Sequence, residues 1–183
     1  METRDIVRIA LFAAVIGALG ILPKFDLPVA GGVPVTAQSL GVMLAGIFLG
    51  ARKGALALLL FGFLVVLGLP LLAGGRGGLG VLYGPSAGFF IGFVPAAFVC
   101  GLMMERLTAL PVFPGAVLAG LLGGIVVMYA FGIPVLAWRA NMSLIQATLG
   151  SMAFLPGDII KAVIAGFVAE AASRSVPNAI AGH

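Results

Sequence analysis

The stretch Leu155-Pro156-Gly157-Asp158-Ile159-Ile160-Lys161 opens the last long apolar segment of the chain. It places a carboxylate and an ammonium three residues apart at the head of a segment that is otherwise strongly apolar. Residues at i and i+3 share one face of a helix, so Asp158 and Lys161 are predicted to be neighbours. Ionisable side chains inside a membrane segment are costly unless they are paired or face a cavity. The pair therefore marks a candidate functional site.

The composition around this stretch is that of a membrane protein. The 183 residues are 62% hydrophobic and 9% charged, with a mean hydropathy of +1.24, whereas roughly a quarter of the residues in soluble domains are charged. Apolar runs recur along the whole length with short polar breaks, a pattern typical of helices that are apolar all round. The length suits a single domain, residues 1–183. We therefore expect an all-α integral membrane protein.

Six apolar segments are candidate membrane spans, since about 20 residues cross a hydrocarbon core of about 30 Å. They cover about residues 6–22, 36–50, 54–72, 86–104, 114–134 and 156–173. The second segment is short, which fits a small tilt or a local thinning of the bilayer. The first resembles the apolar part of a signal peptide, but no small-x-small cleavage site follows it. We interpret it as a helix of the mature protein.

The distribution of basic residues predicts the orientation of these spans. Six spans place both termini on one side, which then carries six basic residues against three on the other side. These are Arg4, Arg8, Arg52, Lys53, Arg106 and Arg174 against Lys24, Arg76 and Arg139. The excess predicts cytoplasmic termini. The segment around Arg76 and the head of the last span then both lie at the outer face.

Several function classes find no support in the sequence. The basic residues are scattered singly instead of forming a stripe with aromatic residues, so we expect no nucleic-acid partner. Cys100 is the only cysteine and lies within an apolar run, so neither a disulfide framework nor a metal site is predicted. Gly75, Gly77 and Gly80 match a dinucleotide-binding pattern by spacing alone, outside the strand and helix that the pattern requires. No cofactor is expected.

The segment 73–85 is too rich in glycine to be predicted as a helix. Its glycines alternate with Leu, Val and Tyr, whereas flexible connectors favour residues such as Ser. We interpret it as an outer lid or binding loop, with a flexible connector as the alternative. Its amide groups and Arg76 suit an anionic group. Ser86, which follows, fits a hydrolase pattern by spacing, but the only histidine is His183 in the tail, so Ser86 is interpreted as a helix N-cap.

Three smaller patterns also bear on the fold and on the site. Ala10, Ala14 and Ala18 form a small-residue stripe that suits close helix packing, either within the bundle or against another subunit. Thr36 fits a cap of the second span, whereas the amide of Gln38 needs a partner in the outer loop, the last span or a ligand. Ser143 and Gln146 fit a capping box and predict a short outer helix at 143–153.

Three separated stretches, in order, carry a family resemblance. They are Val33-Pro34-Val35-Thr36-Ala37-Gln38-Ser39-Leu40-Gly41-Val42-Met43-Leu44-Ala45-Gly46, the glycine-rich run from Gly74 to Pro85, and Phe154-Leu155-Pro156-Gly157-Asp158-Ile159-Ile160-Lys161. Together they resemble the BioY family, the biotin-specific S components of energy-coupling factor (ECF) transporters. One departure is Ser86-Ala87-Gly88, where the family pattern leads us to expect threonine and a second glycine.

The resemblance implies a six-helix S-component fold that captures biotin from outside for import and has no enzymatic activity of its own. It implies substrate-binding roles for residues of all three stretches, namely Asp158, Lys161, Arg76, Gly75, Gly78, Tyr83, Gln38 and Thr36. As partners it implies a transmembrane coupling (T) subunit that docks on the alanine stripe, and two ATPase subunits. It also implies a multi-pass location among the lipids of a bacterial inner (plasma) membrane and leaves a homo-oligomer open.

Two alternatives remain at this stage. One is an S component for another vitamin, and the other is a membrane enzyme that uses Asp158 and Lys161 chemically. The chain has no P-loop, so ATP hydrolysis is expected only in partner subunits.

Overall fold

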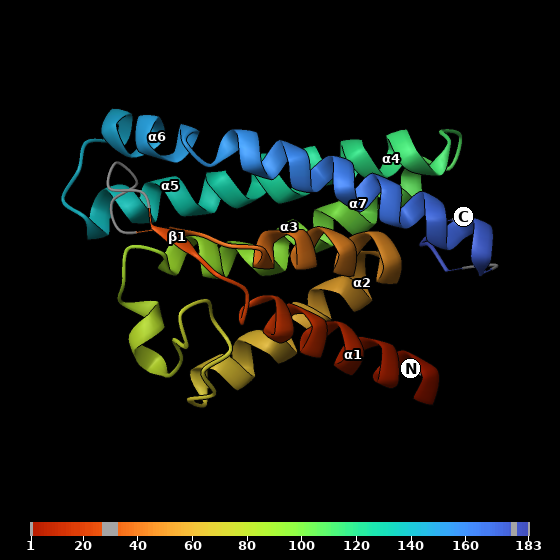
Figure 1. The fold of residues 1–183 in the computed structure, drawn as a ribbon, viewed down its shortest axis with the longest axis horizontal. Helices are drawn as coiled ribbons and strands as arrows, with labels where there is room; N and C mark the ends of the chain where they lie inside the picture. The colour runs from red at the N-terminus through yellow and green to blue at the C-terminus, as the bar shows by residue number, and fades with distance from the viewer. Residues whose placement is uncertain (1, 27–32, 177–178, 183) are drawn as a thin grey trace.

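Helices form most of the structure, a computed structural model that describes residues 2–26, 33–176 and 179–182. The helices lie along one long axis (Figure 1). They are α1 (Thr3–Leu19), α2 (Gln38–Val66), α3 (Ala87–Arg106), α4 (Val112–Ala119), α5 (Met128–Arg139), α6 (Leu144–Met152) and α7 (Leu155–Ser175). The shorter elements are β1 (Phe25–Asp26), β2 (Pro34–Val35), the 3₁₀ helix η2 (Leu79–Leu82) and the π-helix η3 (Gly120–Val127).

Helix α2 folds back on itself at Gly50. This residue has φ +83° and ψ 176°, a conformation that glycine adopts without a steric penalty. A Cβ on Gly54 would lie 3.0 Å from the carbonyl oxygen of Ala45, although residues nine apart in a straight helix are about 13 Å apart. The ribbon shows the reversal (Figure 1). The predicted segments 36–50 and 54–72 thus correspond to two arms, residues 38–49 and 51–66, and residues 68–72 lie beyond the helix.

A second long helix is continuous from α4 through η3 to α5, residues 112–139, and is longer than the predicted segment 114–134. Glycines in η3 bring it close to its neighbours. A Cβ on Gly123 would clash with Cys100 of α3, and one on Gly124 would clash with Met43 of α2. Small residues at these positions therefore let three helices meet around η3, one turn before Tyr129.

The predicted capping box is confirmed at the start of α6. Ser143 Oγ accepts from Gln146 N at 3.2 Å, and Gln146 Oε1 accepts from Ser143 N at 2.9 Å. α6 and α7 form a bent pair with an angle of 52°. The bend lies just before Asp158.

The structure contains fewer obvious spans than the six expected. Among the described residues, α2, α3 and residues 112–139 are long and apolar enough to cross a membrane, and the bent pair α6–α7 raises the number to four. The two arms of α2 count as one helix here. α1 has 17 residues, somewhat fewer than the about 20 of a typical span.

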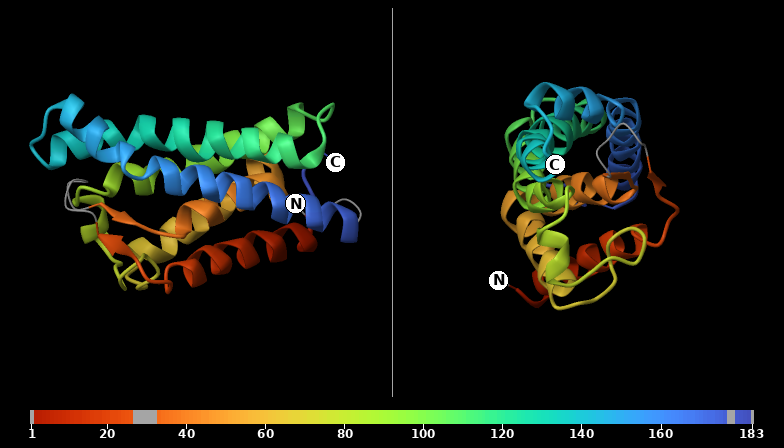
Figure 2. Two further views of the ribbon diagram at one scale, coloured as in Figure 1. Left: turned by 45° about the horizontal axis from the view of Figure 1, so that its top comes forward. Right: turned by 90° about the vertical axis from the view of Figure 1, so that its left-hand side faces the viewer.

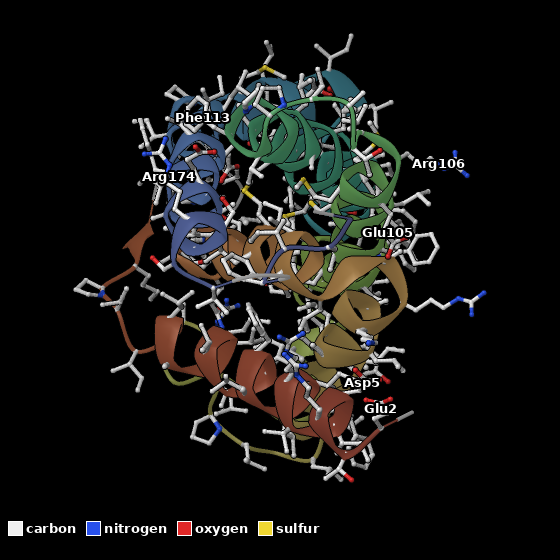
Figure 3. All side chains as sticks on the ribbon, turned by 90° about the vertical axis from the view of Figure 1, so that its right-hand side faces the viewer. Glu2, Asp5, Glu105, Arg106, Phe113 and Arg174 are labelled. Atoms are coloured by element: carbon white, nitrogen blue, oxygen red, sulfur yellow. The ribbon has the colours of Figure 1, made fainter. Side chains whose placement is uncertain are left out.

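Both ends of the chain lie at one end of the bundle, and the β hairpin and the loop before α3 lie at the other (Figure 1). α1 lies along one side of the bundle (Figure 2) and packs on α2. Figure 3 views the end with the termini, where Asp5, Glu105, Arg106 and Arg174 lie around the rim of the bundle.

Two local features differ from the sequence prediction. β1 and β2 pair antiparallel, with Phe25 opposite Val35, where no strands were expected. The loop 73–85, which we expected to be non-helical, contains η2. The glycines flank this 3₁₀ turn instead of preventing it, and Gly78 before it has φ +79°.

Candidate functional site

A pocket lies between elements at the end of the bundle opposite the termini. Its walls come from β2, the first turn of α2, the loop before α3, and helices α3, α5 and α7. Most of the wall is apolar or aromatic. The polar side chains on it are Thr36, Gln38, Ser39, Arg76, Ser86, Tyr129, Asp158 and Lys161. An apolar pocket with a few convergent polar groups is typical of a small-molecule site.

Four of these residues form a hydrogen-bonded cluster, which we call the Asp158 network: Ser39, Tyr129, Asp158 and Lys161. Asp158 is only 5% exposed. Its Oδ2 accepts from Tyr129 OH at 2.8 Å, and its Oδ1 accepts from Ser39 Oγ at 3.2 Å and from Lys161 Nζ at 2.9 Å. Lys161 Nζ also donates to Ser39 Oγ at 2.9 Å. The predicted pairing of Asp158 with Lys161 is confirmed, and α2 and α5 contribute to it as well.

Local helix chemistry favours a carboxylate at position 158. Asp158 lies in the first turn of α7, just after Pro156, where the partial positive charge of the helix N-terminus favours a carboxylate. The network also leaves capacity for a ligand. An ammonium has three N–H donors, and Lys161 uses two of them. A carboxylate has about four acceptor positions, and three of those on Asp158 are occupied.

Edge-to-face aromatic contacts build the apolar wall. The ring of Phe89 packs on Tyr129 at 6.0 Å between centroids and on Phe154 at 6.3 Å, with interplanar angles of 83° and 90°. A Cβ on Gly132 would clash with the Phe89 ring, so glycine makes room for it. Phe90 and Phe93 form a second such pair at 6.1 Å. Rings held in this way form a firm surface against which a flat heterocycle can pack.

Arg76 reaches the pocket on a short turn. Leu72 and Arg76 exchange backbone hydrogen bonds of 3.0 and 3.1 Å, and both side chains line the pocket. Arg76 Nη1 donates to Ser86 Oγ at 3.0 Å and its Nε donates to the Ala73 carbonyl at 3.2 Å. Both acceptors are uncharged. Ser86 occupies the N-cap position of α3 as predicted, but its hydroxyl accepts from Arg76 instead of capping the helix.

Gln38 is 2% exposed and uses its amide within the protein. Its Nε2 donates to the carbonyls of Ile16 and Leu71, and its Oε1 accepts from Ala73 N. The sequence analysis considered the loop 73–85, the last span and a ligand as partners of this amide. The structure shows hydrogen bonds to the loop, at Ala73, and also to Leu71 and to Ile16 of α1. Thr36 Oγ1 accepts from Gln38 N at 3.3 Å, but Ala37 and not Thr36 occupies the N-cap position of α2.

Three predicted site residues do not line the pocket. Gly75 and Gly78 have positive φ values of 70° and 79° and shape the loop. Tyr83 is 69% exposed, with its ring 5.7 Å from the guanidinium carbon of Arg139.

The alanine stripe of α1 lies on the outside of the bundle. Ala10, Ala14 and Ala18 are exposed, whereas Ile9 and Ile16 on the opposite face are buried. The sequence left open whether this stripe packs within the bundle or against another subunit. In this structure the three alanines do not pack within the bundle.

The site contains residues that the sequence analysis did not single out: Ser39, Tyr129 and the aromatic wall. One signal was available for Tyr129. A tyrosine within an apolar span normally needs a partner for its hydroxyl. Ser39 follows Gln38 directly, but a single serine near a helix start is most often read as a cap.

Comparisons with known proteins agree with this geometry. The model of the BioY family matches residues 1–178. The biotin transporter BioY of Rhizobium etli is 51% identical over 182 residues, and that of Rhodobacter capsulatus is 50% identical over 187 residues, with 97% of each chain covered in both cases. The probable biotin transporter BioY of Bacillus subtilis is 43% identical over 168 residues, which cover 90% of this chain and 88% of the relative.

A solved structure has the same fold. It is the crystal structure of the S-component for biotin from an ECF-type ABC transporter, which superposes with a TM-score of 0.87 at 29% identity. The match covers 95% of each chain.

Proposed function

Since the chain belongs to the BioY family, we propose that it captures biotin in the pocket around Asp158 and serves as the substrate-binding S component of an ECF-type transporter. Its relatives are named as biotin transporters, and the similar solved structure is an S-component for biotin. The pocket adds an independent argument from chemistry.

The Asp158 network is the observation that carries the proposal. Biotin has a ureido ring with two N–H donors and one carbonyl acceptor, fused to an apolar sulfur-containing ring. The free acceptor position of Asp158 suits a ureido N–H, and the third N–H of Lys161 suits the ureido carbonyl. The aromatic wall beside them suits the apolar ring.

The carboxylate tail of biotin is proposed to lie toward Arg76. Lys161 already has a carboxylate partner in Asp158 at 2.9 Å. Among the residues that the structure describes, the Arg76 guanidinium donates only to the neutral oxygens of Ser86 and Ala73. A guanidinium with neutral partners gains more from an added carboxylate than a paired ammonium does. Thr36 and Ser39 lie on the same wall and complete the polar contacts.

The chain is proposed to span a bacterial inner (plasma) membrane six times, with both termini in the cytoplasm and the pocket facing outward. The excess of basic residues on the terminal side supports this orientation. So does the position of both termini at the end opposite the pocket (Figure 1). The six proposed spans are α1, the two arms of α2, α3, residues 112–139 and the bent pair α6–α7.

The proposed partners are a transmembrane coupling subunit and two ATPase subunits. The sequence has no P-loop, so the energy for import has to come from other chains. The exposed stripe of Ala10, Ala14 and Ala18 is the proposed contact face for the coupling subunit, because small residues let two helices approach closely within lipid.

The decisive experiment is to incubate the purified chain with labelled biotin in lipid nanodiscs. We expect one bound biotin per chain, recovered chemically unchanged, and competition by unlabelled biotin but not by riboflavin or thiamine. Competition by another vitamin alone would identify an S component of different specificity. Chemical conversion of the ligand would indicate a membrane enzyme instead.

A further inference from the structure

The amide of Gln38 lies where three parts of the chain meet. Its Nε2 donates to the carbonyl oxygen of Leu71 at 3.0 Å and its Oε1 accepts from Ala73 N at 3.1 Å. The side-chain amide thus pairs with the backbone on both sides of Leu72, as a neighbouring strand would. Leu72 is buried and lines the pocket. Gln38 therefore fixes the start of the turn that carries Leu72 and Arg76.

The third hydrogen bond ties the same amide to α1. Gln38 Nε2 also donates to the Ile16 carbonyl at 3.2 Å. Ile16 is among the last four residues of α1, whose carbonyls have no partner within the helix. One buried side chain thus caps α1 and holds the loop before α3. We call this set of groups, Ile16, Gln38, Leu71 and Ala73, the Gln38 junction.

Gly20 provides independent evidence that the junction is tightly packed. A Cβ at Gly20 would clash with the Leu71 carbonyl and would lie 2.9 Å from Gln38 Nε2. Gly20 has φ −71°, which any residue adopts, so this contact and not the backbone conformation requires glycine. The end of α1 and the start of the loop are therefore in direct contact.

The junction is also next to the binding network in sequence. Ser39, which donates to Asp158 and accepts from Lys161, follows Gln38 in the first turn of α2. The same helical turn therefore carries a hydroxyl of the Asp158 network and the amide that holds the loop.

We propose that Gln38 is a positioning residue for ligand retention: it holds the Leu72–Arg76 turn and the end of α1 against the pocket, without donating to the ligand. This inference rests on the proposed function, since biotin is the ligand to be retained. It reassigns Gln38 from a ligand contact to a residue that acts through Leu72 and Arg76. Loss of the junction then accelerates ligand release and leaves ligand entry much less affected.

The test compares dissociation rates of labelled biotin from the full chain in nanodiscs. We expect Gln38→Met, which keeps the volume and removes all three hydrogen bonds, to release biotin roughly three- to tenfold faster, since such bonds contribute modestly each. The association rate should change little. Gln146→Met, at an exposed position on α6, is the matched control and should release biotin at the wild-type rate.

Gly20→Ala perturbs the same junction from α1 while leaving the Gln38 side chain unchanged. It should also accelerate release, and the double variant should release no faster than the faster single variant, because both act on one junction. Gly115→Ala, whose added Cβ would make only ordinary contacts near 4 Å, is its control.

The outcomes separate the two proposals. A wild-type chain that does not bind biotin overturns the proposed function. A wild-type chain that binds biotin, with Gly20→Ala releasing it at the wild-type rate, overturns the positioning role. In that case an effect of Gln38→Met alone would assign Gln38 to direct ligand contact. Rates are measured on monodisperse protein, so a purely structural loss appears as a lower yield or melting temperature with unchanged release.

Discussion

Asp158 accepts hydrogen bonds from Tyr129, Ser39 and Lys161, so a change of its charge affects three neighbours at once. Asp158→Asn leaves Lys161 without its counter-charge and replaces one acceptor by a donor. Lys161→Ala leaves a carboxylate that is 5% exposed without its cation. We expect each substitution to weaken biotin binding by more than about tenfold, because a buried partner is left unpaired. Equilibrium dialysis with labelled biotin measures the loss.

A second lysine–aspartate pair offers a control for this prediction. Lys53 pairs with Asp5 at the end of the bundle that carries the termini, and the lysine is partly exposed. Lys53→Ala should leave binding unchanged, since exposed pairs contribute little. Unaltered affinity in well-folded Asp158→Asn and Lys161→Ala would mean that the buried pair only stabilises the start of α7.

Removal of the Tyr129 hydroxyl tests the contribution of the Asp158 network apart from that of the aromatic wall. Tyr129→Phe keeps the edge-to-face contact with Phe89 and removes only the 2.8 Å hydrogen bond to Asp158. We expect biotin affinity to fall by about tenfold or more, because a hydrogen bond to a charged group contributes about 1.5–3 kcal/mol. Isothermal titration calorimetry provides the measurement. Tyr83→Phe, at the exposed second tyrosine, should bind as the wild type does.

The sequence predicted only part of this site, for a physical reason. Asp158 and Lys161 are three residues apart, so helix geometry alone brings them together. Ser39 and Tyr129 lie 119 and 29 residues from Asp158 along the chain. Their contacts depend on how α2, α5 and α7 pack, which a single sequence pattern does not specify.

Among the elements, the reversal of α2 at Gly50 depends on one backbone conformation and one hydrogen bond. Gly50 has φ +83°, and the next amide, Ala51 N, donates to Glu105 Oε1 of α3 at 2.9 Å. Glu105 thus acts as the N-cap that the second arm lacks in its own sequence. We expect Glu105→Ala to lower the free energy of unfolding by about 1 kcal/mol. Gly50→Ala should lower it by about 1–2 kcal/mol or more, through backbone strain and because the added Cβ would clash with Glu105 Oε1.

Thermal unfolding in detergent checks both changes. Arg106→Ala is the control for Glu105, because Arg106 is the next residue and points away from the bundle (Figure 3). Gly62→Ala is the control for Gly50, since its added Cβ would make one ordinary contact at 3.6 Å. Equal melting temperatures for Gly50→Ala and Gly62→Ala would contradict the role assigned to the positive φ.

Helices were predictable from the sequence where a long apolar run or a capping pair of nearby residues defines them. The apolar segments located the ends of the helices to within about six residues, and Ser143 and Gln146 identified the start of α6. β1 and β2 were missed, since strands of two residues are too short to show an alternating pattern. η2 was missed because glycine density argues against an α-helix but permits a single 3₁₀ turn.

At the scale of the whole molecule, the pocket and the termini occupy opposite ends of the bundle, and α1 lies along one side between them (Figure 2). Its inner face packs through Ile9, Ala13 and Ile16, and its outer face presents the alanine stripe. The Gln38 junction connects the end of this helix to the pocket. A subunit docked on α1, as proposed, would therefore contact the element that is tied to the Leu72–Arg76 turn at the pocket.

This arrangement predicts that binding and transport can be separated by one substitution on α1. Ala14→Trp adds a large side chain to the centre of the exposed stripe and leaves the pocket intact, so biotin binding should be unchanged. Uptake of labelled biotin by cells that also express the coupling and ATPase subunits should fall, because the bulky ring prevents close helix approach. Val126→Trp, also exposed but on η3, is the matched control and should retain uptake. Retained uptake in Ala14→Trp would refute the docking role of the stripe, and equal loss in both variants would assign the defect to membrane insertion.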